Sequence, residues 1–250
     1  MAGDLSDGIN GFAGYWKNGD TVILSQERSD WGATSIVVSG SDVYISGNTP
    51  PGNYSVAKYW KNGIAVILSD GVRTASANAI AVSGNDVYVA GWVDNGITGV
   101  ATYWKNGSPV ILDLQHSVAN SIAVSGNDVY VAGTVNNVAT YWKNGVAVSL
   151  SDAKSILAEA NSIVVNGNDV YVAGYDNPTP HEFASYWKNG VTVALSSSPP
   201  NAYAIVVYEK DIYVSGQLNN VATYWKNGVA VSLPAGTGFS TANSIFISKD

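Results

Sequence analysis

The chain contains no cysteine, and charged residues make up only 12% of it. The absence of cysteine excludes disulfide bonds, thiolate metal ligands and thiol nucleophiles. Basic residues are also scarce, with 12 lysines and arginines against 19 aspartates and glutamates. Because nucleic-acid binding needs a concentrated basic surface, the net charge of −7 predicts that no nucleic acid is a partner.

Long apolar runs are missing as well. No stretch approaches the 18 or so apolar residues that cross a bilayer, which predicts no membrane span. The start of the chain, Met1 to Asp4, does not have the pattern of a signal peptide. Two locations therefore stay open: the cytoplasm or, after removal of a leader, the periplasm or cell surface.

The residues that are abundant are those of a β-rich globular protein. Hydrophobic residues make up 46% of the chain, with 26 glycines and 15 tyrosines. Because there are only four phenylalanines and one methionine, aromatic packing must come from tyrosine and tryptophan. A chain of 250 residues suffices for one large all-β domain or two ordinary domains, and composition alone does not decide between them.

Three short motifs recur along the chain in a fixed order. The first is the pentapeptide YWKNG, the second is of the type SGNDVYVAG and the third of the type ANSIAV. YWKNG begins at Tyr15, Tyr59, Tyr103, Tyr141, Tyr186 and Tyr224. The spacing of 38 to 45 residues is typical of a repeat protein in which each unit forms one supersecondary structure.

Each repeat predicts four short antiparallel strands. In the copy that follows Ala119, the strands are expected at residues 121–124, 128–133, 138–142 and 146–150. The alternation of apolar residues supports this interpretation, since Val129 and Val131 share one face of their strand. Asn144 and Gly145 suit a type I′ hairpin turn, because both tolerate positive φ.

Six such repeats predict an all-β fold: a six-bladed β-propeller with four antiparallel strands per blade, formed by a single domain of residues 1–250. The first strand of each repeat is apolar or small on both faces, as the innermost strand of a blade requires. The C-terminal strand 243–250 is expected to complete the N-terminal blade, because Met1-Ala2-Gly3 aligns with the end of a second strand. About two residues are missing at that join, so it should be the weakest place in the ring.

The motifs ATYWKNG and SGNDVYVAG resemble those of uncharacterised bacterial β-propeller repeat proteins, and the resemblance covers nearly the whole chain. It implies a six-bladed propeller and, for many members, export to the cell envelope, but no activity and no catalytic residue. Lys58, in place of the usual threonine, and Glu209-Lys210, in place of a Gly-Asn turn, depart from the pattern. Residues 136–150 and 219–233 are identical, which fits either recent repeat amplification or consensus engineering.

Chain direction assigns the loops of each repeat to two opposite ends. The turns between the first and second strands and between the third and fourth strands vary little. The connections between the second and third strands and between repeats differ in length and sequence. Loops on a rigid scaffold usually carry the binding residues. The candidate ligand-binding residues at this variable end are Trp31, Tyr54, Trp92, Tyr175, His181 and Tyr203.

Two functions fit this arrangement. The first is a non-enzymatic binding or interaction scaffold, a monomer that binds a protein or another macromolecule through its variable end. The alternative is a carbohydrate-binding, lectin-like propeller, whose loop aromatics would stack on sugar rings. A glycan array distinguishes the two.

Residues suited to catalysis or metal binding are few. The only two histidines, His116 and His181, lie in different kinds of loop two repeats apart, so neither a catalytic triad nor a histidine-rich metal site is expected. No P-loop, GxSxG, HExxH or dinucleotide motif occurs. A glycosidase would need a pair of loop carboxylates, such as Asp94 with Asp70. We therefore expect no enzyme activity, no metal and no cofactor.

Two further residue types recur in every repeat. The YWKNG tryptophans are expected to pack between blades, because a residue needed in every blade serves packing first. The lysine beside each tryptophan is expected on the opposite face or in solvent. The turn aspartates should bond their own turn backbone, and one carboxylate per turn is too few for calcium. These aspartates are Asp42, Asp86, Asp128, Asp169, Asp211 and Asp250.

Overall fold

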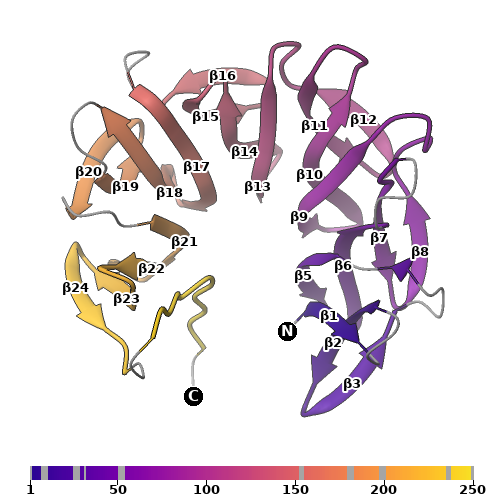
Figure 1. Cartoon of the computed structure of the whole chain (residues 1–250), viewed down its shortest axis with the longest axis horizontal. Helices are drawn as coiled ribbons and strands as arrows, with labels where there is room; N and C mark the ends of the chain where they lie inside the picture. Colours follow the sequence, from indigo (N-terminus) through magenta and orange to yellow (C-terminus); the bar gives the residue numbers. More distant parts are fainter. Residues whose placement is uncertain are drawn as a thin grey trace. The chain divides into compact units, whose positions relative to one another are not determined.

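The computed structural model describes residues 2–6, 11–24, 29–30, 32–49, 54–151, 155–178, 183–196, 201–234 and 238–248. β-strands are the only regular elements in these ranges (Figure 1). Within them, no helix is long and apolar enough to cross a membrane. The all-β class predicted from the sequence is therefore confirmed for the part of the chain that the structure describes.

The strands form six sheets of four strands, numbered here in chain order. In sheets 2 to 6 the strands pair in the order in which they occur in the chain, as antiparallel neighbours. Sheet 2 comprises β5 (Ala33–Ser39), β6 (Asp42–Asn48), β7 (Ala57–Lys61) and β8 (Ile64–Ile67). Sheet 3 comprises β9 (Ala75–Ser83), β10 (Asp86–Asp94), β11 (Gly99–Lys105) and β12 (Ser108–Ile111).

The remaining sheets follow the same plan. Sheet 4 comprises β13 (Ser117–Ser125), β14 (Asp128–Val135), β15 (Val138–Lys143) and β16 (Val146–Ser149). Sheet 5 comprises β17 (Ser155–Asn166), β18 (Asp169–Pro178), β19 (Phe183–Lys188) and β20 (Val191–Ser196). Sheet 6 comprises β21 (Asn201–Tyr208), β22 (Asp211–Leu218), β23 (Val221–Lys226) and β24 (Val229–Ser232).

Sheet 1 departs from this plan. Its first three strands are antiparallel, but the fourth pairs with β2 in the parallel direction. The strands are β1 (Ala2–Ser6), β2 (Gly11–Lys17), β3 (Asp20–Ile23) and β4 (Ser29–Asp30). Ala2 lies opposite Tyr15, as Ala90 lies opposite Tyr103 in sheet 3. The N-terminal residues thus occupy the place of a second strand, as predicted.

The C-terminal segment does not form the strand expected at 243–250. Residues 238–248 contain no strand, and 249–250 lie outside the described residues. A β-strand needs cross-strand hydrogen bonds from a neighbour, and none is made by residues 243–248. Pairing of this segment with β1 therefore stays a prediction.

The chain forms two compact units, Met1–Gly126 and Asn127–Asp250. Sheets 1 to 3 and β13 belong to the first unit, whereas β14 to β24 belong to the second. The expectation of a single domain over residues 1–250 stays a prediction.

The hairpin turns have the conformation that the sequence predicts. Asn144 and Gly145 both have positive φ, 50° and 82°, as a type I′ turn requires. The Gly-Asn turns between first and second strands place their glycine at positive φ, as at Gly84 with 58°. In sheet 6 Glu209 takes that place with a φ of 56°, a conformation that favours glycine.

A repeated irregularity explains the glycine of the VYVAG motif. The ladder between β9 and β10 shifts at Ala90 and Gly91, so the backbone of β9 bulges towards β10. A Cβ atom on Gly91 would lie only 1.8 Å from the carbonyl oxygen of Ser76. Gly174 and Gly216 meet the same constraint in sheets 5 and 6. Only glycine fits this position because a backbone carbonyl occupies the space of a side chain.

The YWKNG tryptophans form the core between neighbouring sheets. Five of them are at most 1% exposed: Trp60, Trp104, Trp142, Trp187 and Trp225. Trp104 of sheet 3 packs with Tyr44, Tyr59 and Leu68 of sheet 2. The prediction that these tryptophans are packing residues is confirmed.

Hydrogen bonds between first strands also tie neighbouring sheets together. The side chain of Asn78 in β9 donates to the carbonyl of Ala119 in β13 (2.9 Å). Asn161 in β17 donates in the same way to Ala202 in β21 (2.9 Å). The polar residue of the ANSIAV motif therefore joins one repeat to the next, and this explains why it recurs.

Candidate functional site

Each sheet has two ends of different chemistry. We define the turn end as the end with the turns between first and second strands and between third and fourth strands. The loop end carries the connections between second and third strands and between successive sheets. The predicted ligand-binding residues lie at the loop end.

The turn end is closed by a repeated cluster of polar side chains. In sheet 3, Asp86 accepts hydrogen bonds from Asn106 Nδ2 (2.7 Å, Oδ1) and Tyr88 OH (3.3 Å, Oδ2). The Lys105 ammonium lies 2.8 Å from Asp86 Oδ2. Asn106 Oδ1 in turn accepts from the backbone N–H of Val87 (2.9 Å). The cluster joins the end of the third strand to the start of the second.

The same cluster recurs in four other sheets. Its ion pairs measure 2.7 to 3.0 Å. They are Lys61 with Asp42, Lys143 with Asp128, Lys188 with Asp169 and Lys226 with Asp211. The expectation that these aspartates bond their own turn backbone is wrong, because their carboxylates bind the lysine and asparagine side chains of YWKNG instead. The lysines are partly exposed on the strand face opposite the tryptophans, as expected, and each also pairs with an aspartate. Asp250 lies outside the described residues.

These contacts shift the pKa values of the paired groups. Hydrogen bonds from Lys105 and Asn106 lower the pKa of Asp86 below its ordinary value. The bond to Asp86 raises the pKa of Lys105. The pKa values of Asp42, Asp128, Asp169 and Asp211 are lowered by the corresponding asparagines and lysines. All five carboxylates are therefore charged and occupied at neutral pH.

The sign of these shifts predicts acid sensitivity. Because the pKa of Asp86 is lower in the folded than in the unfolded chain, the cluster stabilises the fold above the unfolded pKa, and that stability is lost as pH falls through the folded pKa. We expect the free energy of unfolding to fall between about pH 5 and pH 2. Urea unfolding at pH 7, 5 and 3 measures this.

The variant Asp86→Asn should weaken this pH dependence. Asp20→Asn, which removes a carboxylate of the turn end outside the clusters, should leave it unchanged. Equal slopes for the two variants would contradict the assignment. At the alkaline side, the raised pKa of Lys105 predicts that its contribution is lost only as pH rises above the ordinary lysine value.

The loop end holds the residues predicted as the ligand site, and the described ones are divided between the two units. Trp31 and His181 lie outside the described residues. Tyr54, in the connection before β7, is 48% exposed. It belongs to the first unit, as does Trp92, whereas Tyr175 and Tyr203 belong to the second.

The other three aromatics are only partly exposed. Trp92 covers Gly99, since a Cβ there would lie 3.0 Å from the indole ring. The Tyr175 hydroxyl donates to Glu159 Oε2 (3.0 Å), and Tyr203 lies within β21. Their role in binding stays a prediction.

Two loop-end acids bond their own turns, and the described histidine bonds a residue of another connection. Asp70 Oδ1 accepts from Val72 N (3.0 Å), and Asp94 Oδ1 accepts from Gly96 N (2.7 Å). His116 Nδ1 lies 2.8 Å from Thr98 Oγ1. Across the described ranges, no three acidic or histidine side chains gather as metal ligands would.

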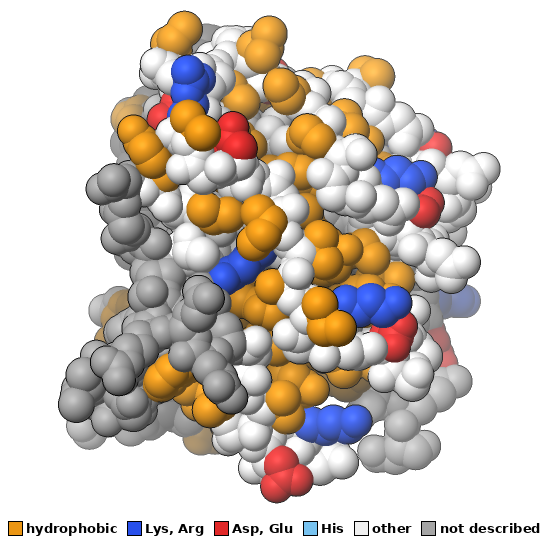
Figure 2. All heavy atoms as spheres, turned by 90° about the vertical axis from the view of Figure 1, so that its right-hand side faces the viewer, with side chains coloured by type: hydrophobic (Ala, Val, Ile, Leu, Met, Phe, Trp, Pro, Cys, Tyr) orange, Lys and Arg blue, Asp and Glu red, His pale blue; other side chains and the backbone are white. Residues whose placement is uncertain are grey.

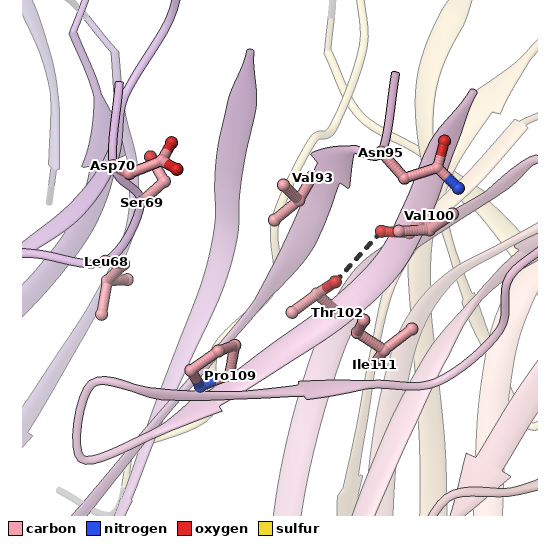
Figure 3. Close-up of a pocket in the computed structure, with 9 residues that line it drawn as sticks. All are labelled: Leu68, Ser69, Asp70, Val93, Asn95, Val100, Thr102, Pro109 and Ile111. Carbon is pink, nitrogen blue, oxygen red and sulfur yellow. Dashed lines mark hydrogen bonds between the residues drawn. The ribbon is translucent and has the colours of Figure 1, made fainter. Parts of the chain in front are cut away.

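An apolar groove of about 490 Å³ opens between sheets 2 and 3 at the loop end (Figure 3). One wall is formed by Leu68, Ser69 and Asp70, which follow β8. The facing wall is formed by β10, β11 and β12, with Val93, Asn95, Val100, Thr102, Pro109 and Ile111. None of the described candidate ligand-binding residues lines this groove, although Asp70, named above as a possible glycosidase carboxylate, does.

Exposed apolar side chains surround the groove. Ile97 is 94% exposed, Leu114 71% and Val72 64%. A second, shallower hollow of about 620 Å³ is lined by residues 111–115 and shares Ile111 with the groove. Figure 2 shows hydrophobic side chains in patches on this side of the molecule, with lysine and aspartate side chains beside them.

A signal for the groove is present in the sequence, in the fourth strands of the repeats. Pro109 stands where β8, β16 and β24 have alanine. Pro109 lies opposite Trp104 in the ladder and lines the groove. Because proline has no backbone N–H, it cannot donate a hydrogen bond to the ladder at this position. The candidate residues predicted from the sequence lie in loops, whereas most residues that line the groove lie in strands, and the prediction therefore did not include the groove.

No protein-family model matches the chain, and no curated protein is similar to it in sequence.

Proposed function

We propose that the chain is a non-enzymatic binding scaffold, a six-bladed β-propeller whose ligand site is the loop end. One observation carries this proposal, the contrast between the two ends of the first unit. The turn end is closed by clusters such as that of Asp86, whose partners are all internal. The loop end carries an apolar groove with Ile97 and Leu114 exposed beside it. Exposed apolar surface of this kind typically marks an interaction site.

The packing of tryptophan supports closure of the ring. Trp60 packs with Leu24, and Trp104 with Leu68, so each tryptophan contacts the leucine that follows the fourth strand of the preceding sheet. Trp16 has no preceding sheet within its unit, and it is partly exposed. A last blade placed before the first would lie against Trp16 as sheet 1 lies against Trp60.

The two identical segments identify the counterpart of that contact. Leu150 in residues 136–150 is 6% exposed, whereas Leu233 at the same place in residues 219–233 is 38% exposed. Because the sequences are identical, the difference comes from the surroundings. β17 follows the first copy, but no strand follows the second within the described residues. Leu233 and Trp16 are therefore the pair that closure would bury.

The C-terminal segment makes the same hydrogen bond to sheet 6 that the connection before β9 makes to sheet 2. Ser240 Oγ accepts from the backbone N–H of Ala222 (2.9 Å). Ser69 accepts from Ala57 in the same way (3.0 Å), and β9 follows it. Residues 243–250 are thus proposed to fill the inner place beside β1.

The available side chains favour binding over catalysis. Asp70 and Asp94 each hold a turn, and His116 bonds Thr98. Paired carboxylates of a glycosidase would face each other across a substrate site instead. The closed ring needs one chain only, so we propose a monomer.

Orientation on a surface tests the site. Since the chain has no cysteine, Ser108→Cys at the turn end or Ile97→Cys at the loop end gives one attachment point each. The two proteins, biotinylated and bound to streptavidin beads, are probed with a library of random dodecapeptides on phage and with a glycan array. Ligands should bind when the protein is held through Ser108→Cys and be blocked when it is held through Ile97→Cys.

Binding that is equal in both orientations, or absent in both, would overturn the proposal. The carbohydrate-binding alternative is favoured by the exposure of Tyr54. It predicts glycan hits in the Ser108→Cys orientation that Tyr54→Ala abolishes. Peptide hits without glycan hits would exclude it.

A further inference from the structure

The repeats differ in residue type at one position near the end of each fourth strand. In sheets 1 to 3 this position holds isoleucine, which is 54% to 58% exposed. The three residues are Ile23, Ile67 and Ile111, opposite Gly14, Lys58 and Thr102. In sheets 4 to 6 the same ladder position holds small residues, namely Ser149, Ala194 and Ser232.

The fold does not need isoleucine at this position. Ser149 and Ser232 occupy it in sheets with the same strand order and register. More than half of each isoleucine surface faces water, so these side chains add little to the core. Exposed apolar side chains that folding does not require indicate a contact with another molecule.

One of these isoleucines, Ile111, lines the groove between sheets 2 and 3, opposite the Leu68-Ser69-Asp70 wall (Figure 3). Ile67 points to the other face of sheet 2, because its neighbour Leu68 packs with Trp104 of sheet 3. The groove is lined mostly by carbon, with Val93 and Pro109 between the two walls. It has no aromatic side chain in its described lining. An aliphatic or aromatic side chain fits such a groove better than a sugar ring, whose hydroxyls would lose their hydrogen bonds to water.

Most polar atoms of the groove are already engaged. Thr102 Oγ1 donates to the carbonyl of Val100, and Ser69 Oγ accepts from Ala57 N. Asp70 uses Oδ1 for its own turn, and its Oδ2 has no partner among the described residues. Asn95 likewise uses Oδ1 for its own turn. Asp70 Oδ2 and Asn95 Nδ2 of the described lining are therefore left to face a ligand.

The charge around the groove is negative. The connections 68–74, 94–98 and 112–116 carry three aspartates, Asp70, Asp94 and Asp113, and one cationic side chain, Arg73. Lys61 and Lys105 do not compensate, because they are paired at the turn end. Lys58, the other lysine of these two sheets, is buried with its ammonium over the Trp60 ring. A cationic partner would be attracted to this surface, and an anionic one repelled.

We propose that this groove binds an extended segment of a partner protein that carries an aliphatic or aromatic residue next to lysine or arginine. The apolar side chain enters between Leu68 and Ile111, and the cation lies beside Asp70. This inference rests on the proposed function, because it specifies the partner of the loop end.

Binding by defined variants tests the proposal. Random dodecapeptides on phage are selected on the full chain, and enriched peptides are synthesised and titrated. We expect leucine, isoleucine or phenylalanine beside lysine or arginine in the enriched peptides. The variant Ile111→Ser, which introduces the residue type found at Ser149 and Ser232, should weaken binding at least about tenfold.

The charge is tested separately. Asp70→Asn keeps the oxygen that accepts from Val72 N but loses the charge, and it should weaken binding about three- to tenfold, with less effect at high salt. The controls are Ile64→Ser and Asp20→Asn, which remove an isoleucine that is 73% exposed and an acid at the turn end. Both should leave affinity within about twofold, since rim contacts away from a site contribute little.

Several outcomes would overturn the inference. These are failure to enrich any peptide, enrichment of acidic peptides, unchanged affinity in Ile111→Ser, or glycan binding that Ile111→Ser abolishes. Self-association of the chain that Ile111→Ser abolishes, seen by sedimentation, would also overturn it. If ligand binding depends on the orientation of the attached protein but is unchanged in Ile111→Ser, the scaffold proposal stands and this inference fails. If binding does not depend on orientation, both fail.

Discussion

Replacing Trp225 with alanine is expected to lower the free energy of unfolding by about 3–5 kcal/mol. The side chain is fully buried and packs between sheets 5 and 6, against Tyr171 and Tyr186. Truncation leaves a cavity between two rigid sheets, which cannot collapse without breaking their ladders. Urea unfolding followed by circular dichroism measures the loss.

Trp225→Phe is the matched control. The indole Nε1 of Trp225 has no hydrogen-bond partner in the described structure, so phenylalanine removes no hydrogen bond. It should cost about 1 kcal/mol, the range of a volume change without a lost polar contact. If both variants were as stable as the parent, Trp225 would not be a packing residue and the inter-sheet core would be misassigned.

Removal of residues 243–250 is expected to have a comparable effect, about 3–6 kcal/mol. In the proposed ring, Ile245 takes the place of Ile80 and Ile163, which are 7% and 6% exposed. At least two apolar side chains would lose their burial, at about 1.5–3 kcal/mol each, and the edge of β1 would open. Urea unfolding and sedimentation measure the loss of stability and any association through β1.

Two controls make this experiment specific. Removal of Lys249 and Asp250 alone should have little effect, because the strand remains. A synthetic peptide of residues 242–250, added to the shortened chain, should restore stability in proportion to its concentration. A shortened chain that unfolds like the parent would show that the segment closes nothing.

The strands and turns could be predicted from the sequence because their causes are local. Asn144 and Gly145 form the expected turn since both adopt positive φ at low cost, and six copies repeat the signal. The place of β1 follows from the same repeats, and its register opposite Tyr15 agrees. Such features depend on neighbours a few residues away.

The site could not be predicted in the same way because it depends on which sheets face each other. The groove joins Leu68 to Pro109, which are far apart in sequence. The charged clusters escape prediction for a similar reason. Asp86 is 20 residues from Asn106, and the sequence pattern places each in its own turn.

The spacing of these contacts has a consequence for how the chain folds. The turn-end clusters join residues 16 to 20 positions apart, and the bonds from Asn78 and Asn161 to the next first strand span 41. Loop closure over such distances is fast and costs little entropy. Sheets 2 to 6 can therefore form one after another during synthesis, each on the edge of the last, and a proposed contact between β1 and residues 243–250 would be the slow final step.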